Sequence, residues 1–436
     1  MEEPPRSVTE TPTQLGYDPL RWRWVEPSVW TARMLTALEQ GVKGGCWFSL
    51  IDKVYSVRCL HAAACQVEAN QGACGVDYVT VRTFAAGRDE EVAKLSQQLQ
   101  QGEYRPQAVR RVHIPKPGTK DTRPLGIPAV RDRVVQAAVV KVIAPIFERD
   151  FAEHSYGFRP GRGCKDALRR VDALLKQGYV HVLDADLKSY FDTIPHSRLM
   201  DRLRTKISDG RLLTLIESFL QANIMDGLQE WKPTAGAPQG AVLSPLLSNV
   251  YLDPLDHLLA ESGFEMVRYA DDFVILCRTA EDAERALQLV QQWTNEQGLT
   301  LHPDKTRIVD ARSEGFDFLG YTFRGGKHFP RTKSRQRLKD ALRQKTRRNS
   351  GESLSQIIAH VNRTLRGWFE YFKHSPRNHL KPFDGWLRDR LRRVLRRRQR
   401  CGVGLDRIRW PNAYFAKQGL YSLVTAFDVA VRSLNR

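Results

Sequence analysis

The sequence predicts an α+β protein of more than one domain, and three observations lead to that prediction. Two pairs of short apolar runs flank polar turns, at residues 109–127 and 266–276, as strands do in β-hairpins. Amphipathic stretches with a period near 3.6 residues separate and follow these hairpins, which indicates helices. Residues 331–400 are helical in period and carry 22 Lys and Arg against 5 Asp and Glu, a net charge of +17.

The length of 436 residues suits two to four domains with a substantial core. A formal net charge of +19 makes a polyanion the leading partner. No apolar run approaches the roughly 18 residues of a membrane-spanning helix, and residues 1–14 are no signal peptide, so we expect a cytoplasmic protein without a membrane partner. Seven cysteines without a C-x-x-C pair indicate reduced thiols, neither a disulfide framework nor a zinc site.

The N-terminal part is predicted to be mostly helical around one hairpin. Helical patterns cover residues 30–57, 89–101, 132–146 and 164–175, and Asp132 is expected to be the N-cap of the third. Between them, residues 109–115 form a strand that leads into a basic turn. Lys116, Lys120 and Arg123 in this turn can bind phosphates, the alternative being an exposed basic turn.

The middle of the chain alternates strands and helices. Strands are expected at residues 179–187, 266–269, 273–276, 298–309 and 316–323, and helices at 197–203, 212–220, 242–258 and 281–295.

Three basic helices are expected next, at residues 336–347, 355–373 and 386–399. The last has Leu391, Val394 and Leu395 on one side. Five arginines accompany this apolar stripe: Arg392, Arg393, Arg396, Arg397 and Arg398. The pattern favours a helical bundle laid against nucleic acid, the alternative being a solvated charged face.

Three carboxylates are candidates for one site. Asp186 ends an apolar strand, and Asp271 and Asp272 lie at the tip of a hairpin between two more strands. If these strands are neighbours, the acids converge at one sheet edge, where hard oxygen ligands can hold two Mg²⁺ ions for phosphoryl transfer. The alternatives are a solvated Asp-Asp turn, and Asp186 as a strand-end cap with Asp184 as the relevant acid.

Tyr269–Asp272 (YADD) resembles the signature hairpin of reverse transcriptases, and its surroundings resemble the bacterial group II intron-encoded reverse transcriptase, or maturase, family. The motifs that carry the resemblance follow in order and cover nearly the whole chain beyond about residue 30. They are NQGACGVDYVT, VRRVHIPKPGTKDTRPLGIP, HSYGFRPGRG, DADLKSYFDTIPH, GAPQGAVLSPLLSNVYLDPLD, VRYADDFVIL, GLTLHPDKT, FDFLGYTF, LRGWFEYF and WPNAYFAKQGL.

The resemblance implies a right-hand polymerase with fingers, a palm built on an antiparallel sheet, and a helical thumb. It divides the chain into an N-terminal extension (1–60), fingers (61–175), palm (176–325), a basic three-helix thumb or maturase domain (326–400) and a short DNA-binding-like segment (401–436). Only Cys401 lies in the last region, whereas the family's optional endonuclease domain carries cysteine pairs, so the endonuclease-lacking form is expected.

The resemblance also implies roles for individual residues. Asp186, Asp271 and Asp272 match the metal-binding triad, which takes two Mg²⁺ ions, with Mn²⁺ as an alternative. Lys116 and Arg123 match residues that contact the incoming triphosphate, although a longer loop leaves Lys116 or Lys120 open. Three further positions match nucleotide contacts: Phe191 as the gate against a 2′-hydroxyl, Gln239 at the new base pair, and Lys305 as a proton donor to pyrophosphate or a plain surface lysine.

The implied function is RNA-directed DNA synthesis combined with help to intron splicing and mobility. The implied partners are group II intron RNA, an RNA template with a DNA primer, dNTPs and target DNA. A splicing-only maturase is one alternative, but it has no chemical need for all three carboxylates. A domesticated relative that serves host DNA repair or defence is the other.

Overall fold

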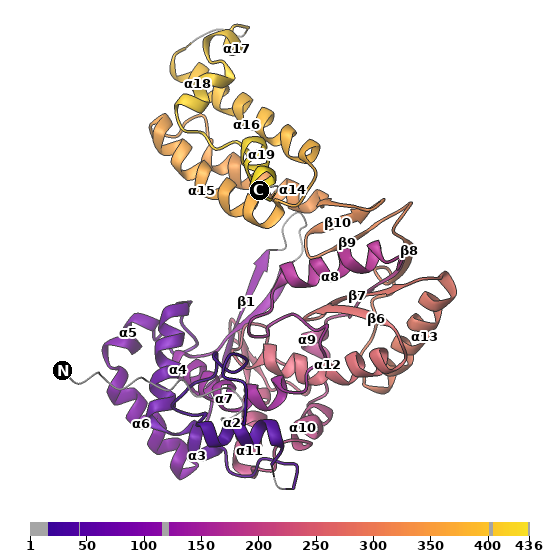
Figure 1. Ribbon diagram of the computed structural model, residues 1–436. Coiled ribbons are helices and arrows are strands. Elements are labelled where there is room, and N and C mark those ends of the chain that lie inside the picture. The colour runs from indigo at the N-terminus through magenta and orange to yellow at the C-terminus, as the bar shows by residue number, and fades with distance from the viewer. Residues whose placement is uncertain (1–15, 43, 116–121, 401–403, 435–436) are drawn as a thin grey trace, which may run out of the picture. The chain divides into compact units, whose positions relative to one another are not determined.

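The computed structural model describes residues 16–42, 44–115, 122–400 and 404–434 (Figure 1). The chain divides into two compact units. The first comprises residues 1–167, 185–275 and 284–306, and the second comprises residues 168–184, 276–283 and 307–436. Each unit draws on separate stretches of the sequence, and the division into fingers, palm and thumb stays a prediction.

Helices build the beginning of the first unit. They are α2 (Ala32–Gln40), α3 (Ile51–Val54), α4 (Val57–Asn70), α5 (Val81–Ala86), α6 (Arg88–Gln101) and α7 (Val130–Glu148). The single helical stretch expected at residues 30–57 is therefore broken, with turns between α2 and α3. Helix α7 is buried along most of its length, and α4 packs against it.

Asp132 is not the N-cap that the sequence predicted, because α7 begins two residues earlier with Ala129 as its N-cap. The Asp132 side chain is buried instead. Its carboxylate accepts hydrogen bonds from the Tyr104 hydroxyl at 2.6 Å and from the Gln107 backbone N–H at 2.9 Å.

The predicted hairpin at residues 109–127 is confirmed. Strands β1 (Val109–Pro115) and β2 (Thr122–Ile127) pair antiparallel, with Arg110 opposite Ile127. The turn that contains Lys116 and Lys120 lies outside the described residues. Strand β1 also pairs in parallel with β4 (Ile224–Asp226), which forms a hairpin with β5 (Gln229–Trp231), so the sheet order is β2-β1-β4-β5.

The acidic hairpin belongs to a second four-stranded sheet, of order β6-β7-β3-β8. Its strands are β6 (Glu265–Tyr269), β7 (Asp272–Cys277), β3 (His181–Asp186) and β8 (Arg307–Asp310). Of the strand expected at residues 298–309, only the last three residues belong to β8, which extends to Asp310. Before them, Leu301 forms an isolated bridge with Leu187. The helices in this stretch of the sequence are α8 (Cys164–Lys176), α9 (Tyr190–Thr193), α10 (His196–Arg204), α11 (Gly210–Leu220), α12 (Ser244–Glu261) and α13 (Ala280–Glu296).

The strand expected at residues 316–323 is a tight hairpin. Strands β9 (Phe316–Phe318), β10 (Tyr321–Arg324) and β11 (Lys327–Pro330) form a sheet of order β11-β10-β9. Leu319 and Gly320 both adopt positive φ between β9 and β10, which reverses the chain.

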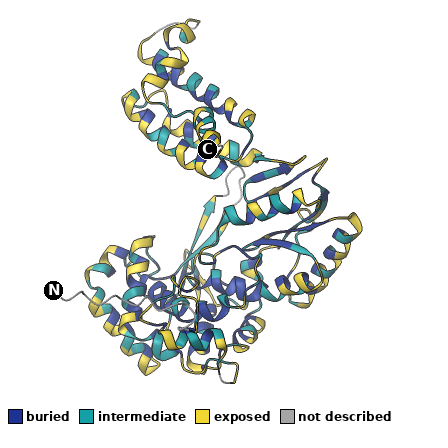
Figure 2. Cartoon of the chain, in the orientation of Figure 1, coloured by how far each residue is buried: buried dark blue, intermediate teal, exposed yellow. Residues whose placement is uncertain are grey.

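The three predicted basic helices are α14 (Thr332–Lys345), α15 (Leu354–Phe372) and α16 (Arg377–Arg398). Ser353 and Gln356 form a capping box at the start of α15, and the apolar side of that helix, which includes Ile357, Val361 and Leu365, is buried. Figure 2 shows buried residues along one side of these helices and exposed residues along the other. Three short helices follow: α17 (Asp406–Arg409), α18 (Asn412–Lys417) and α19 (Leu423–Leu434).

The hydrophobic core of this helical part extends past residue 400, where the sequence placed the end of the thumb. Trp410, Phe415 and Leu423 are buried in the same cluster as Leu365 and Leu391. The last described residues therefore complete the core of the basic helices. Among the helices of the described residues, none combines the length and the apolar character that crossing a bilayer requires.

Candidate active site

The acidic hairpin turns sharply at one residue. Strand β6 ends at Tyr269 and β7 begins at Asp272, and between them Ala270 adopts a left-handed backbone with φ +61°. A left-handed conformation strains a residue that has a Cβ, and such strain persists where the surrounding structure enforces it. The turn leaves Asp271 half-buried and Asp272 exposed.

Asp186 and Asp271 lie close enough to repel each other. Burial raises the pKa of Asp271 above its usual range, and the negative charge of Asp186 raises it further. Lys305 opposes this effect, since its Nζ lies 2.5 Å from Oδ2 of Asp186. Backbone pairing sets this geometry: the His302 N–H donates to the Asp186 carbonyl at 2.7 Å.

These carboxylates suit a divalent cation, because a cation would relieve the repulsion between Asp186 and Asp271. Within the described ranges, however, no three Asp, Glu, His or Cys side chains are grouped closely enough to hold one ion. The assignment of Asp186, Asp271 and Asp272 to a metal site therefore stays a prediction. Asp184, the alternative acid, lies 3.5 Å from Arg307 on the adjacent strand β8.

A cavity of about 390 Å³ brings together two of the predicted nucleotide contacts, Phe191 and Gln239. The loop of residues 236–240 joins its walls: the Ala237 N–H donates to the Phe191 carbonyl at 2.7 Å, and the Gly126 N–H donates to the Gln239 carbonyl at 2.6 Å. Backbone contacts thereby fix α9 and β2 against one loop.

Two glycines of this loop are required by close backbone approach. Gly240 has φ +105°, and a Cβ there would lie 2.6 Å from the Gly126 carbonyl oxygen. Gly236 has φ +95°, and a Cβ there would lie 2.9 Å from the Phe191 carbonyl oxygen. Any larger residue would push the loop away from α9 or β2 and open the cavity.

The structure says less about the other residues that were predicted to contact the nucleotide. Arg123 is exposed on β2, immediately before Pro124, which lines the cavity. Lys116 and Lys120 lie outside the described residues, and Lys305 pairs with Asp186.

Sequence reasoning missed several residues that line the cavity. The Arg111 guanidinium lies over the Trp231 ring, 4.9 Å from its centroid, and both residues line the cavity. Asp192 lines it as well, and burial raises the pKa of this carboxyl. The alternation of charged residues in β1 was a signal for Arg111, but nothing in the sequence indicated that a distant tryptophan would meet it.

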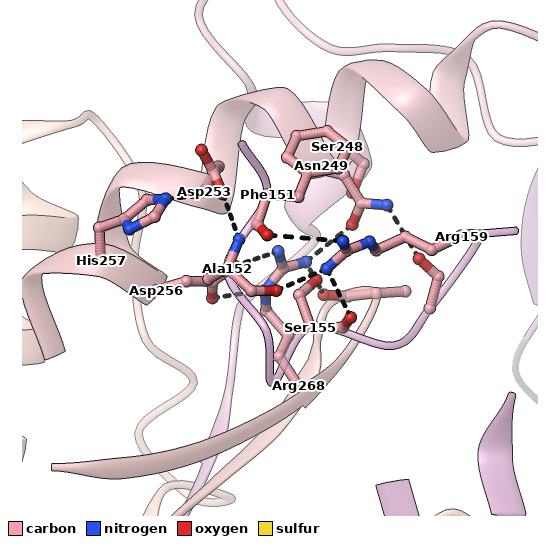
Figure 3. Close-up of polar contacts among 12 residues, drawn as sticks. Phe151, Ala152, Ser155, Arg159, Ser248, Asn249, Asp253, Asp256, His257 and Arg268 are labelled. Atoms are coloured by element: carbon pink, nitrogen blue, oxygen red, sulfur yellow. Dashed lines mark hydrogen bonds and ion pairs between the residues drawn. The ribbon is translucent and has the colours of Figure 1, made fainter. Parts of the chain in front are cut away.

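A buried polar network lies under the acidic turn (Figure 3). The Arg268 side chain is 1% exposed, and its guanidinium donates to both Asp256 carboxylate oxygens, to Asn249 Oδ1 at 2.9 Å and to the Ala270 carbonyl at 2.9 Å. Burial alone would lower the pKa of Arg268, but the Asp256 carboxylate outweighs it and the pKa is raised. The bond to Ala270 ties this network directly to the strained residue beside Asp271.

The loop of residues 154–159 is fastened to the same turn. The Tyr156 N–H donates to the Arg268 carbonyl at 2.8 Å, and Asn249 Nδ2 donates to the Gly157 carbonyl at 2.8 Å. Arg159, whose side chain is 2% exposed, pairs with Glu148 at 2.7 Å. Its guanidinium also donates to the Ala152 and Ser155 carbonyls (Figure 3). Sequence reasoning named this segment only as the motif HSYGFRPGRG and gave its residues no role.

The prediction of a basic face on α16 is wrong for one of its five arginines, Arg392. Arg392 is 6% exposed, because its guanidinium donates to the Trp410 carbonyl at 2.9 Å and to Asn412 Oδ1 at 2.8 Å. Arg396 is half-buried and lies 2.9 Å from Asp406. Arg393, Arg397 and Arg398 are exposed, and their contact with nucleic acid stays a prediction.

Comparison with known proteins assigns this fold to the class of template-copying polymerases. Residues 114–323 match the family described as reverse transcriptase (RNA-dependent DNA polymerase), and residues 335–409 match the group II intron maturase-specific domain. The chain belongs to the group II intron reverse transcriptase/maturase family. The predicted family, right-hand polymerase fold and RNA-directed DNA polymerase class are thereby confirmed.

Individual relatives cover different shares of the chain. Protein YkfC of Escherichia coli (strain K12) is 35% identical over 326 residues, which cover 65% of this chain and 84% of YkfC. The group II intron-encoded protein LtrA of Lactococcus lactis subsp. cremoris is 39% identical over 173 residues, 40% of this chain but only 29% of LtrA. A solved chain of a partial Cas6-RT-Cas1–Cas2 complex is 26% identical, covers 57% of this chain and 42% of that chain, and gives a TM-score of 0.37.

Proposed function

We propose that the chain extends a DNA primer along an RNA template at Asp186 and Asp271, as the polymerase of a group II intron. The observation that carries this proposal is that β3, which ends at Asp186, is the neighbour of β7, which begins directly after Asp271. The charge of Asp186 accordingly raises the pKa of Asp271. The charge of Asp271 also acts on Tyr190, whose neighbour Phe191 lines the cavity. This supports assigning the acids and the cavity to one site, in which a nucleotide would lie near the cations.

In the reaction, the primer 3′-oxygen attacks the α-phosphorus of a dNTP, and pyrophosphate leaves as the bond to the β-phosphate breaks. Mg²⁺ ions, when bound, acidify the 3′-hydroxyl and stabilise the charge on pyrophosphate. Asp186, Asp271 and Asp272 would hold these ions. Lys305, whose ammonium lies at Asp186, would be the proton donor to the departing pyrophosphate.

The remaining side chains would select and orient the nucleotide. Arg123, with Lys116 or Lys120, would pair with the triphosphate, since guanidinium and ammonium groups bind phosphate oxygens. Phe191 would exclude a 2′-hydroxyl by its bulk, and Gln239 would contact the new base pair. The shared wall of the cavity supports placing Phe191 and Gln239 on one nucleotide.

For the helical part, we propose binding of group II intron RNA, which would assist splicing and mobility. The match to the maturase-specific domain and the net charge of residues 331–400 support this proposal. The same protein would then act on target DNA when the intron moves.

The experiment is primer extension by the full chain with Mg²⁺, on an RNA template and on a DNA template of the same sequence. We expect DNA synthesis on RNA that requires dNTPs. A parallel splicing assay with intron RNA tests the maturase role. Splicing assistance without any extension would favour the splicing-only alternative, and extension without intron-RNA binding would favour a polymerase in host repair or defence.

A further inference from the structure

Phe158 combines two unfavourable properties next to the acidic turn. Its side chain is 54% exposed, and its backbone is left-handed with φ +58°. An exposed aromatic ring gives up hydrophobic burial, and a left-handed backbone is strained for a residue with a Cβ. Strain of this kind concentrates at functional sites, where the surrounding structure enforces it.

The backbone beside Phe158 touches the turn that carries Asp271. A Cβ on Gly157 would lie 2.2 Å from the Ala270 nitrogen and 2.9 Å from the Tyr269 carbonyl carbon, so only glycine allows this approach. The Phe158 and Tyr269 rings lie 6.4 Å apart between centroids, inclined by 45°. The two aromatic side chains therefore flank the contact between loop and turn.

Neighbouring residues hold Phe158 in place. Before it, Asn249 donates to the Gly157 carbonyl at 2.8 Å. After it, Arg159 is buried and donates to Glu148. It also donates to the Ala152 and Ser155 carbonyls (Figure 3). Because hydrogen bonds hold both residues that flank Phe158, its ring can stay exposed while the buried network remains unchanged.

We propose that Phe158 and Tyr269 form an aromatic platform for the 3′-terminal nucleotide of the primer. This inference rests on the proposed polymerase function. The primer terminus is the reactant that must reach Asp271, and nucleotide bases and sugars pack favourably on exposed aromatic rings. The cavity assigned to the incoming nucleotide contains no residue of the 154–159 loop, so the two nucleotides have separate contacts.

The chain offers a matched control in Tyr78. This residue is also an aromatic with a left-handed backbone, φ +57°, and it is 74% exposed. Phe158→Gly and Tyr78→Gly remove the same kind of strain and the same kind of exposed ring. Both variants should keep or raise the thermal midpoint of unfolding, because glycine adopts positive φ without strain.

Of these two variants, only Phe158→Gly should weaken the binding of the primer. We expect its KM for the primer–template duplex to rise roughly tenfold, as for the loss of one stacked aromatic, with the KM for dNTP unchanged. The Phe158→Tyr variant should have the wild-type KM for the primer–template duplex, and Tyr78→Gly should leave this KM unchanged. Affinity for a duplex whose primer ends in a dideoxynucleotide, measured by fluorescence anisotropy, should fall in parallel.

Photocrosslinking identifies which nucleic-acid strand, primer or template, contacts the aromatic platform. A 5-iodouracil at the primer 3′ end should crosslink to Phe158 or Tyr269 in the wild type, and the same base in the template strand should not. A crosslink from the template alone, an unchanged primer KM, or a rise in the dNTP KM instead would overturn the proposal. Anisotropy and crosslinking need no synthesis, so an inactive wild type would refute the polymerase function while these two readouts still test the platform.

Discussion

Arg268 is predicted to act both on stability and on the position of the acidic turn. Arg268→Met would leave the Asp256 carboxylate, 5% exposed, buried without its partner. Removing one member of a buried ion pair typically costs about 3–5 kcal/mol of unfolding free energy. The Ala270 carbonyl would lose its donor in the same variant.

The double variant Arg268→Met/Asp256→Leu separates the two effects. It removes the orphaned charge, so most of the stability should return, since apolar pairs often replace buried ion pairs without loss. The Ala270 carbonyl still lacks its hydrogen bond, and Asp271 would be held less firmly. We therefore expect kcat for primer extension to stay roughly tenfold low, the effect of one charge-assisted hydrogen bond.

Urea unfolding and steady-state extension measure these quantities on the same protein. Arg377→Met is the control, because Arg377 and Asp428 form an exposed pair, 51% and 39% accessible, whose loss should cost less than about 1 kcal/mol. If the double variant regains stability and full kcat together, Arg268 acts through stability alone and the positioning argument fails.

Three further predictions concern other parts of the chain. Phe191→Ala should raise incorporation of ribonucleotides relative to deoxyribonucleotides in a competition assay; an unchanged ratio would assign the gate to another residue. Arg393→Gln with Arg397→Gln should reduce the slope of log affinity for RNA against log salt by about 1.5, whereas Arg392→Gln should lower the melting temperature and leave the slope unchanged. Burial raises the pKa of the Asp132 carboxyl from 3.8 to about 6, so the folded state binds this proton more tightly than the unfolded state does. The protonated carboxyl therefore contributes up to roughly 3 kcal/mol to the free energy of unfolding, and this contribution should be lost as pH rises from about 4 to 6. Urea unfolding at a series of pH values should show no such loss for Asp132→Asn.

Much of the fold follows from local sequence pattern. The apolar stripe of α15 is buried at Ile357, Val361 and Leu365 as its helical period requires. The acidic pair lies at the hairpin tip because two β-branched and aromatic runs surround it. Both features depend on residues close in sequence, whose spacing alone sets which side they share.

The parts that sequence could not give depend on partners far along the chain. Arg392 belongs to a run of arginines that looks uniformly solvated, yet Trp410 and Asn412, about 20 residues later, supply acceptors that bury it. Arg268 interrupts an apolar strand, and only the fold brings Asp256 and Asn249 to its guanidinium. A long cationic side chain is buried when such acceptors surround it, and their identity is not a local property.

Metal-dependent DNA synthesis at Asp186 and Asp271 can be measured directly by single-turnover kinetics. Single-turnover extension of a DNA primer on RNA with Mg²⁺ should be abolished by Asp271→Asn and by Asp186→Asn, while each variant binds the duplex as the wild type does. Asp310→Asn is the matched control, because Asp310 also ends a strand of the sheet but pairs with Arg312, so extension should persist. Normal extension by a folded Asp271→Asn protein would contradict the account.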